Sequence, residues 1–271
     1  MRLFLLIISA TAFAASADAE QITQTDLRHL PDAQVYVLGE FHDSAIQHQN
    51  QATAVEALAP KALVFEMLSP EQIEKITPAD RVDQTLFDAA TSWSSSGWPD
   101  LSLYWPIFEA APTAPIYGAW VQRDALREAF SNGAAEVFGP EAMRYGLTSP
   151  LPESEQSERE QQQFEAHCGA MPLEMMGGMV ASQRLRDAQL AKVTLDALQK
   201  HGAPVAVITG NGHARTDWGM PVYVTRAAPE VDVLSIGQLE SAPEGQPPYD
   251  LWLVTAPTDR GDPCEGFGQT Q

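Results

Sequence analysis

Three short apolar runs in this chain each lead into a residue of the kind that builds binding sites. Residues 35–38 run into Gly-Glu-Phe-His, which ends at His42, and residues 205–209 run into Gly-Asn-Gly-His, which ends at His213. The third run is followed directly by Glu66. Parallel strands buried on both faces are continuously apolar, and open α/β sheets bind ligands at the carboxyl ends of their strands. We therefore predict an α/β protein with a site at these strand ends.

The segments between the apolar runs predict helices packed on a sheet. A helix over residues 44–58 would join a strand at 34–38 to one at 62–66. Such a β-α-β unit has a right-handed crossover and parallel strands, so we expect Glu66 to emerge beside His42 on the neighbouring strand. Further strands are expected at residues 115–119, 204–209, 221–225, 231–236 and 250–255.

Helical patterns dominate the middle of the chain, and the longest covers residues 175–200. Residues 92–106, rich in Trp, Ser, Gly and Pro, are expected to form a loop whose aromatic side chains either serve as a ligand lid or interface or simply pack the loop. We predict a mixed, largely parallel sheet flanked by helices, with a helical insert over about residues 69–200. A single domain is expected over residues 20–271.

The N-terminus has the pattern of a signal peptide. Arg2 precedes an apolar stretch over residues 3–15, and the small-x-small sequence Ala-Asp-Ala ends at Ala19. The stretch is shorter than the roughly 20 residues of a membrane-spanning helix, so no permanent span is expected. We predict that residues 1–19 are removed and that the rest is periplasmic or secreted and soluble. No cysteine follows the cleavage site, so no lipid anchor is expected.

Net charge and cysteine content narrow the possible partners. The formal net charge of −20 repels phosphate backbones, and no basic run counters it, so nucleic acid is not an expected partner. The two cysteines, Cys168 and Cys264, lack the Cys-x-x-Cys spacing of thiolate metal sites. In an oxidising compartment such a pair more often forms a disulfide, which is the pairing we predict.

Several polar residues near the strand ends are candidates for the site. Glu40 and His42 alternate along the chain, so they share one side of an extended segment. His48 and Gln51 share a face of the following helix. A carboxylate at the end of a buried strand is costly unless it is paired or bound, so Glu66 either serves a site or forms a structural salt bridge.

Two arginines are candidate anion-binding groups. Arg215 follows His213 closely and can pair with an anionic ligand. Arg186 shares a helical stripe with Gln183, so it points either toward the pocket or, paired with Asp187, toward solvent.

In order, these motifs resemble the ChaN-like haem-binding uptake family, which is grouped with the Tiki metalloproteases, the TraB proteins and the erythromycin esterases. The resemblance extends from about residue 34 to the strand at 250 and rests on residues 39–43, 65–67 and 210–213 with His48-x-x-Gln51 and Gln183-x-x-Arg186-Asp187. It implies an α/β fold whose two Gly-x-x-His elements face a cleft. It also implies haem binding in iron uptake and a homodimer that stacks two haems.

The resemblance further implies a tyrosine ligand to the iron and other side chains on the propionates. Tyr104, in the Trp-rich segment before an apolar helix, is the candidate ligand. Where the family pattern has an Asn-x-Pro-Arg stretch after the third strand, this chain keeps only Arg123. The cofactor-binding residues implied in this way are His42, His48, Tyr104, Arg123, Arg186, His213 and Arg215.

Three functions follow from these observations. The first is an exported protein that binds haem for uptake or trafficking. The second is a metal-dependent peptidase or esterase, with His42, Glu66 and His213 on Zn or Mn, Glu40 as general base and Arg186 on an oxyanion. The third is a structural module with well-bonded histidines. The ordered motifs favour haem.

Overall fold

A seven-stranded sheet forms the centre of the protein, whose computed structural model describes residues 18–262, 264 and 265. All strand pairs in this part of the chain are parallel, in the order β1-β7-β6-β2-β5-β3-β4. The predicted α/β class is confirmed, and the sheet is parallel rather than mixed. The strands are β1 (Glu20–Gln21), β2 (Val35–Glu40), β3 (Ala62–Phe65), β4 (Ile116–Gly118), β5 (Val205–Gly210), β6 (Val233–Leu239) and β7 (Leu251–Val254).

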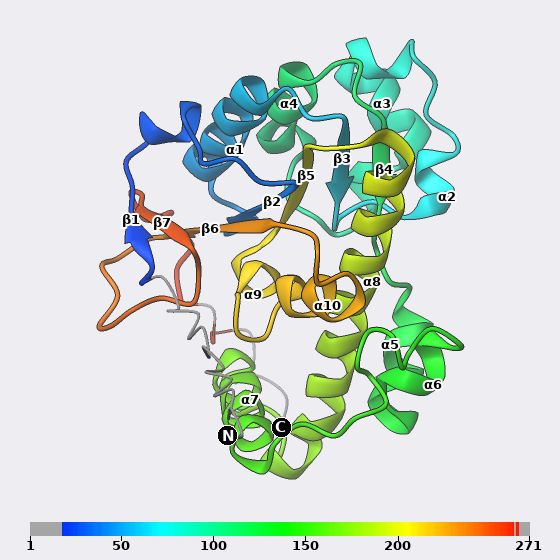
Figure 1. The fold of residues 1–271 in the computed structure, drawn as a ribbon, viewed down its shortest axis with the longest axis vertical. Coiled ribbons are helices and arrows are strands. Elements are labelled where there is room, and N and C mark those ends of the chain that lie inside the picture. Colours follow the sequence, from blue (N-terminus) through cyan, green and yellow to red (C-terminus); the bar gives the residue numbers. More distant parts are fainter. Residues whose placement is uncertain (1–17, 263, 266–271) are drawn as a thin grey trace, which may run out of the picture.

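Helices cover both faces of this sheet (Figure 1). In β2, Val35 and Val37 join the core beneath α8 (Met176–His201) and α10 (Met220–Ala227), whereas Tyr36 and Leu38 join the core beneath α1 and α4. Successive strand residues point to opposite faces, so burial on both faces explains the uninterrupted apolar runs. The remaining α-helices of the described chain are α1 (Ala45–Leu58), α2 (Pro70–Ile73), α3 (Gln84–Thr91), α4 (Leu101–Ala110), α5 (Arg123–Asn132), α6 (Ala134–Phe138), α7 (Glu153–Ala166) and α9 (Asn211–Ala214).

The order of the strands differs from the prediction in one respect that concerns the site. Strands β2 and β3 are not neighbours, because β5 pairs with both of them. The long helical insert explains this, since it lets the chain return to the middle of the sheet. The ends of β2, β5 and β3 therefore lie side by side, with the Gly210 end of β5 in the centre.

Two segments expected to be irregular or extended are helical. Residues 92–106 contain the start of α4, which is capped by Asp100 and buries Leu101, Tyr104 and Phe108 at helical spacing. Residues 221–225 lie in α10 instead of a strand, because Gly219 and Pro221 start a helix there. Of the aromatic residues in the first segment, Trp93 and Tyr104 are fully buried core rather than an exposed patch.

Helix α1 braces the ends of β2 and β6 with polar side chains. Gln51 donates from Nε2 to the Leu38 carbonyl at 2.8 Å, and Gln47 accepts from the Phe41 backbone N–H at 2.5 Å. Gln238 of β6 donates to the Gly39 carbonyl and accepts from Asn50. Buried backbone groups need such partners where a sheet ladder ends. The strand end that carries the first Gly-x-x-His element is thereby held in place.

A disulfide ties the C-terminal tail to the end of α7, as predicted. Cys168 and Cys264 are bonded, with their Cα atoms 5.6 Å apart. Between β7 and Cys264, Arg260 forms ion pairs with both Asp43 and Glu240. In the described residues, no helix combines the length and apolarity needed to cross a membrane. The expected signal peptide lies almost wholly outside the described residues.

Removing the disulfide should destabilise the protein. The bridge closes a loop with a sequence separation of 96 residues, so the variant Cys168→Ser/Cys264→Ser should lose about 2–4 kcal/mol of unfolding free energy. Urea denaturation followed by circular dichroism measures this loss. Reduced wild-type protein is the control and should match the variant. An unchanged unfolding midpoint in both would contradict the prediction.

Candidate functional site

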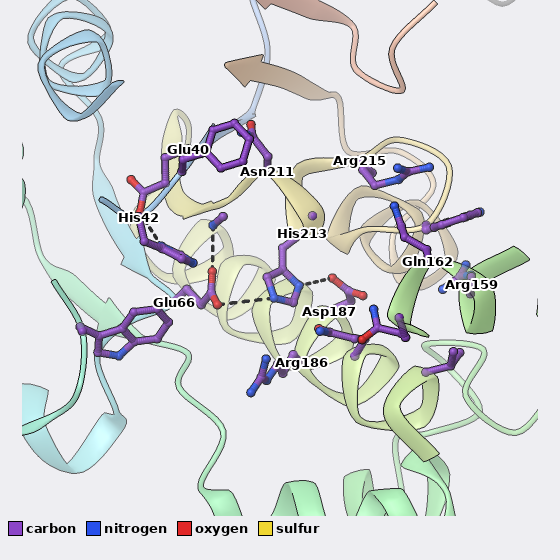
Figure 2. A pocket seen from close by; sticks show the side chains of 18 residues that line it. Glu40, His42, Glu66, Arg159, Gln162, Arg186, Asp187, Asn211, His213 and Arg215 are labelled. Carbon is purple, nitrogen blue, oxygen red and sulfur yellow. Dashed lines mark hydrogen bonds and ion pairs between the residues drawn. The ribbon is translucent and has the colours of Figure 1, made fainter. Parts of the chain in front are cut away.

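A cavity of about 500 Å³ lies at the carboxyl ends of β2, β3 and β5, with α8 and α7 as its far wall (Figure 2). All three apolar runs deliver a predicted residue to it, as the strand-end argument expected. The predicted residues that line it are Glu40, His42, Glu66, Arg186, His213 and Arg215. Gln183 also lines it, so the stripe of α8 that carries Arg186 faces the cavity rather than solvent.

His213 lies between two buried carboxylates. Its Nδ1 is 2.7 Å from Asp187 Oδ1, and its Nε2 is 3.4 Å from Glu66 Oε1. Burial disfavours the charged imidazolium, but the two carboxylates outweigh this and raise the pKa of His213 to about 10. His213 is therefore protonated at neutral pH.

Two groups at the end of β5 donate hydrogen bonds to the second carboxylate oxygen of Glu66. Its Oε2 accepts from the Thr209 hydroxyl at 2.6 Å and from the Gly210 backbone N–H at 2.9 Å. Burial alone would raise the pKa of Glu66, but the positive charge of His213 and these hydrogen bonds hold it well below the usual value. The salt bridge that Glu66 forms is with His213 of the same cavity. Glu66 thereby links β3, β5 and His213.

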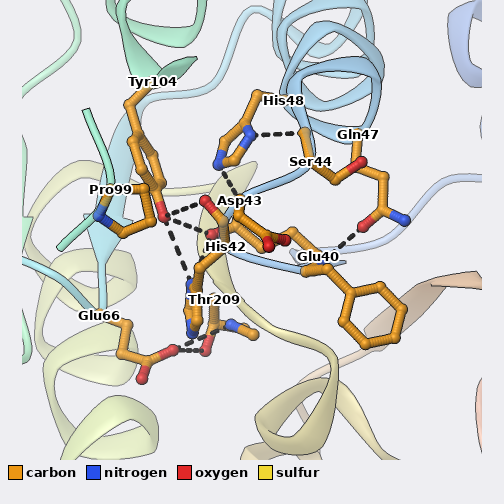
Figure 3. A network of polar contacts seen from close by, with 12 residues as sticks. Glu40, His42, Asp43, Ser44, Gln47, His48, Glu66, Pro99, Tyr104 and Thr209 are labelled. Atoms are coloured by element: carbon orange, nitrogen blue, oxygen red, sulfur yellow. Dashed lines mark hydrogen bonds and ion pairs between the residues drawn. The ribbon is translucent and has the colours of Figure 1, made fainter. Parts of the chain in front are cut away.

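Glu40 is the centre of a second buried polar network (Figure 3). Its Oε1 lies 2.8 Å from His42 Nδ1 and accepts from the Tyr104 hydroxyl at 2.9 Å. Its Oε2 forms an ion pair with His48 Nε2 at 3.0 Å, with angles that fall short of a hydrogen bond. Burial alone would raise the pKa of Glu40, but His48 and His42 lower it to about 2. A carboxylate held in this way is a weak base.

His42 is the more accessible of the two members of this network that line the cavity. Its side chain is 32% exposed, whereas the Glu40 side chain is fully buried. The ring packs edge-on against Trp98, with the centroids 4.8 Å apart. Burial opposes charging, but the carboxylates of Glu40 and Glu66 raise the pKa of His42. A Cβ at position 210 would lie 2.9 Å from His42 Nε2, so Gly210 leaves room for this ring atom.

Aromatic and cationic side chains complete the lining. Arg215 stacks on Trp218 at 4.1 Å and pairs with Asp217. Arg159, on α7, pairs with Glu155 and also lies over Trp218. Arg186 lies 5.9 Å from the Trp120 ring and makes no ion pair with a carboxylate of the described chain. Of the three arginines that line the cavity, Arg186 is therefore the one without a carboxylate partner in the described chain.

Three predicted cofactor-binding residues lie outside this lining. His48 and Tyr104 are fully buried behind Glu40. Burial and the neighbouring Glu40 carboxylate raise the pKa of Tyr104, which keeps its hydroxyl protonated. Exposed Arg123 lines a separate cavity that shares only the Trp98 side of the first one. These positions support a structural role for His48 and Tyr104.

Two parts of the site were not predicted from the sequence. Asp187 was considered only as a surface partner of Arg186, yet it is 4% exposed and holds His213. Adjacent residues of a helix point in different directions. This difference in direction could have shown that Asp187 and Arg186 have separate roles. Arg159 and Trp218, on segments with no motif, offered no sequence signal.

The predicted metal set of His42, Glu66 and His213 does not suit a bare metal ion. A metal-binding histidine must present an unprotonated nitrogen, but both ring nitrogens of His213 face carboxylates. The described residues contain no group of three or more His, Cys, Asp or Glu side chains that could hold a metal. The geometry gives no support to the Zn or Mn alternative.

Comparison with known proteins identifies the family. The profile described as "Haem-binding uptake, Tiki superfamily, ChaN" matches residues 27–224, which is most of the chain. The chain belongs to this family. The resemblance inferred from the ordered motifs is thereby confirmed.

A solved structure supports the fold. The structure of cofacial haem binding to ChaN of Campylobacter jejuni is similar, with a TM-score of 0.62 and 16% identity over 84% of this chain and 89% of that chain. A mutant erythromycin esterase in its open conformation matches at a TM-score of 0.42 and 13% identity over 76% of this chain and 70% of that chain. No curated protein matches the sequence.

The buried pairing of His213 predicts a loss of stability at alkaline pH. Its pKa is about 10 in the fold, against an ordinary pKa of 6.5 for histidine. Its contribution to stability is therefore complete below pH 6.5 and lost as pH rises through 10. The unfolding free energy should therefore fall by up to about 1.4 kcal/mol per pH unit in this window. Urea denaturation at several pH values measures it.

The variant Asp187→Asn is the matched control for this prediction. It keeps the size of the side chain but removes one of the two carboxylates at His213. Because the folded pKa of His213 should then be lower, the alkaline loss should still begin near pH 6.5 but should end at a lower pH and be smaller in total. A wild-type stability that is flat between pH 6.5 and 10 would show that His213 is not charged in the fold.

Proposed function

We propose that this chain is an exported protein that binds haem as its cargo, for haem or iron uptake or trafficking. The observation that carries the proposal is the cavity, because the strand-end motifs of this haem-binding family form its wall. A haem site needs apolar surface for the macrocycle, cations for the propionates and a side chain that can ligate iron. The cavity contains all three.

Different lining residues provide the apolar surface, the cation and the iron ligand. Phe41, Trp98 and Trp218 offer flat apolar surface. Arg186 is the best propionate partner, because Arg215 and Arg159 are already paired with carboxylates. Guanidinium groups bind carboxylates through two parallel hydrogen bonds, which suits a propionate. Haem, when bound, would supply an iron centre that a lining histidine can reach.

Localisation and assembly are part of this proposal. The signal-peptide pattern supports export to the periplasm, and the Cys168–Cys264 bridge fits an oxidising compartment. We propose a homodimer as the haem-loaded form, supported by the cofacial haem binding of Campylobacter jejuni ChaN, the fold relative. Size-exclusion chromatography with light scattering, with and without haemin, tests this assembly.

The hydrolase alternative has weaker support in the geometry. Its general base, Glu40, is enclosed and has a pKa of about 2, far below the value near 7 that suits a base at neutral pH. Its ligand His213 is protonated between two carboxylates. Arg186, assigned to an oxyanion in that scheme, serves a propionate equally well.

Titration with haemin tests the proposal. The purified protein should give a saturable Soret shift, and Arg186→Ala should weaken haemin binding about tenfold because a charged hydrogen-bond partner of about 1.4 kcal/mol is lost. Arg186→Lys should retain part of the affinity. Arg123→Ala, an arginine of the other cavity, is the control and should bind as wild type. The absence of a saturable shift in the wild type would overturn the proposed function.

A further inference from the structure

The cavity offers few side chains that can ligate haem iron. The protein ligands of haem iron are His, Met, Cys and Tyr. No Met, Cys or Tyr of the described chain lines the cavity, and its histidines there are His42 and His213. All six histidines of the sequence are described. Within one protomer, the choice of ligand therefore falls between these two.

His213 is not free to ligate. Asp187 and Glu66 face its two ring nitrogens, and the residue is 8% exposed. Ligation would require breaking one of these contacts and leaving a buried carboxylate without its partner. Breaking one partner out of a buried ion pair is strongly destabilising.

His42 has the arrangement of a metal-ligating histidine. Its Nδ1 faces the Glu40 carboxylate at 2.8 Å, which places the proton on this nitrogen and leaves Nε2 for a ligand. Carboxylate–histidine pairs of this kind fix the ring and raise the basicity of the ligating nitrogen at metal sites. Glu40 is itself held by Tyr104 and His48, so the ring orientation is supported from behind.

The surroundings of Nε2 leave access from the cavity. Gly210 has no side chain, and a Cβ there would come within 2.9 Å of this atom. Trp98 packs edge-on against the His42 ring and lines the same cavity. His42 and Arg186 both line this cavity, and Figure 2 shows Arg186 beside α8. A flat ligand in the cavity would meet an imidazole and a cation.

We propose that His42 ligates the haem iron of this protein through Nε2, in the place that the family resemblance assigned to a tyrosine. The inference rests on the proposed haem binding and adds the identity of the ligand. Tyr104 then acts as a positioning residue, because its hydroxyl holds the Glu40 carboxylate that orients His42.

Resonance Raman spectroscopy of the ferrous haem complex, prepared anaerobically with dithionite, tests the ligand. The wild type should show an iron–imidazole stretching band, and His42→Ala should lose it. Added imidazole should restore the band in this variant by filling the vacated space. Tyr104→Phe should retain the band. His29→Ala, which removes an exposed histidine outside the cavity, is the matched control and should resemble the wild type.

A second variant keeps the proposal testable where His42→Ala does not fold. Gly210→Ala retains His42 but places a methyl group against Nε2, so it should weaken or remove the same band. Gly245→Ala is its control, because a Cβ at this position meets no atom within 4 Å. Circular dichroism confirms the fold of each variant.

The outcomes separate the two proposals. Saturable haemin binding with the iron–imidazole band, lost in His42→Ala and restored by imidazole, supports the ligand assignment. Saturable binding with no such band, or with a band that survives in His42→Ala, overturns the assignment and leaves haem binding intact. A wild type that does not bind haemin saturably overturns both.

Discussion

The buried imidazolium of His213 is the interaction on which the site depends. It forms ion pairs with Glu66 at the end of β3 and Asp187 in the middle of α8, and through Glu66 it also reaches Thr209 and Gly210. Two carboxylates this deep in the protein would be prohibitively costly without it. The cation therefore fixes the distance between the sheet and its longest helix. The cavity is the space that this spacing leaves.

The two Gly-x-x-His elements, alike in sequence, differ in role for a physical reason. Each histidine has a buried carboxylate partner on one nitrogen, Glu40 for His42 and Asp187 for His213. Only His213 has a second carboxylate on its other nitrogen. His213 thereby serves as a buried positive charge that supports the structure, whereas His42 keeps a nitrogen that faces the cavity. Residue type alone does not reveal this difference, because it arises from which strands lie side by side.

The strand ends were predictable, because a strand buried on both faces leaves a continuous apolar run and a polar residue at its exit. Asp187 was not, because its partner His213 lies 26 residues further along the chain. Tyr104 was misplaced for a similar reason. Its Trp- and Pro-rich surroundings are typical of a loop, but the apolar spacing after Asp100 buries it as a helix. Local composition failed where tertiary packing decided the structure.

The disulfide has a consequence for the order in which the protein matures. Cys264 follows β7, the last strand of the described sheet, whereas Cys168 lies two residues after α7, the helix that carries Arg159 into the cavity wall. The bridge can therefore close only after every strand of this sheet has been synthesised. Oxidation of this pair would mark a chain in which all seven strands are present. It would thus tie the α7 wall of the cavity to the tail only at the end of synthesis.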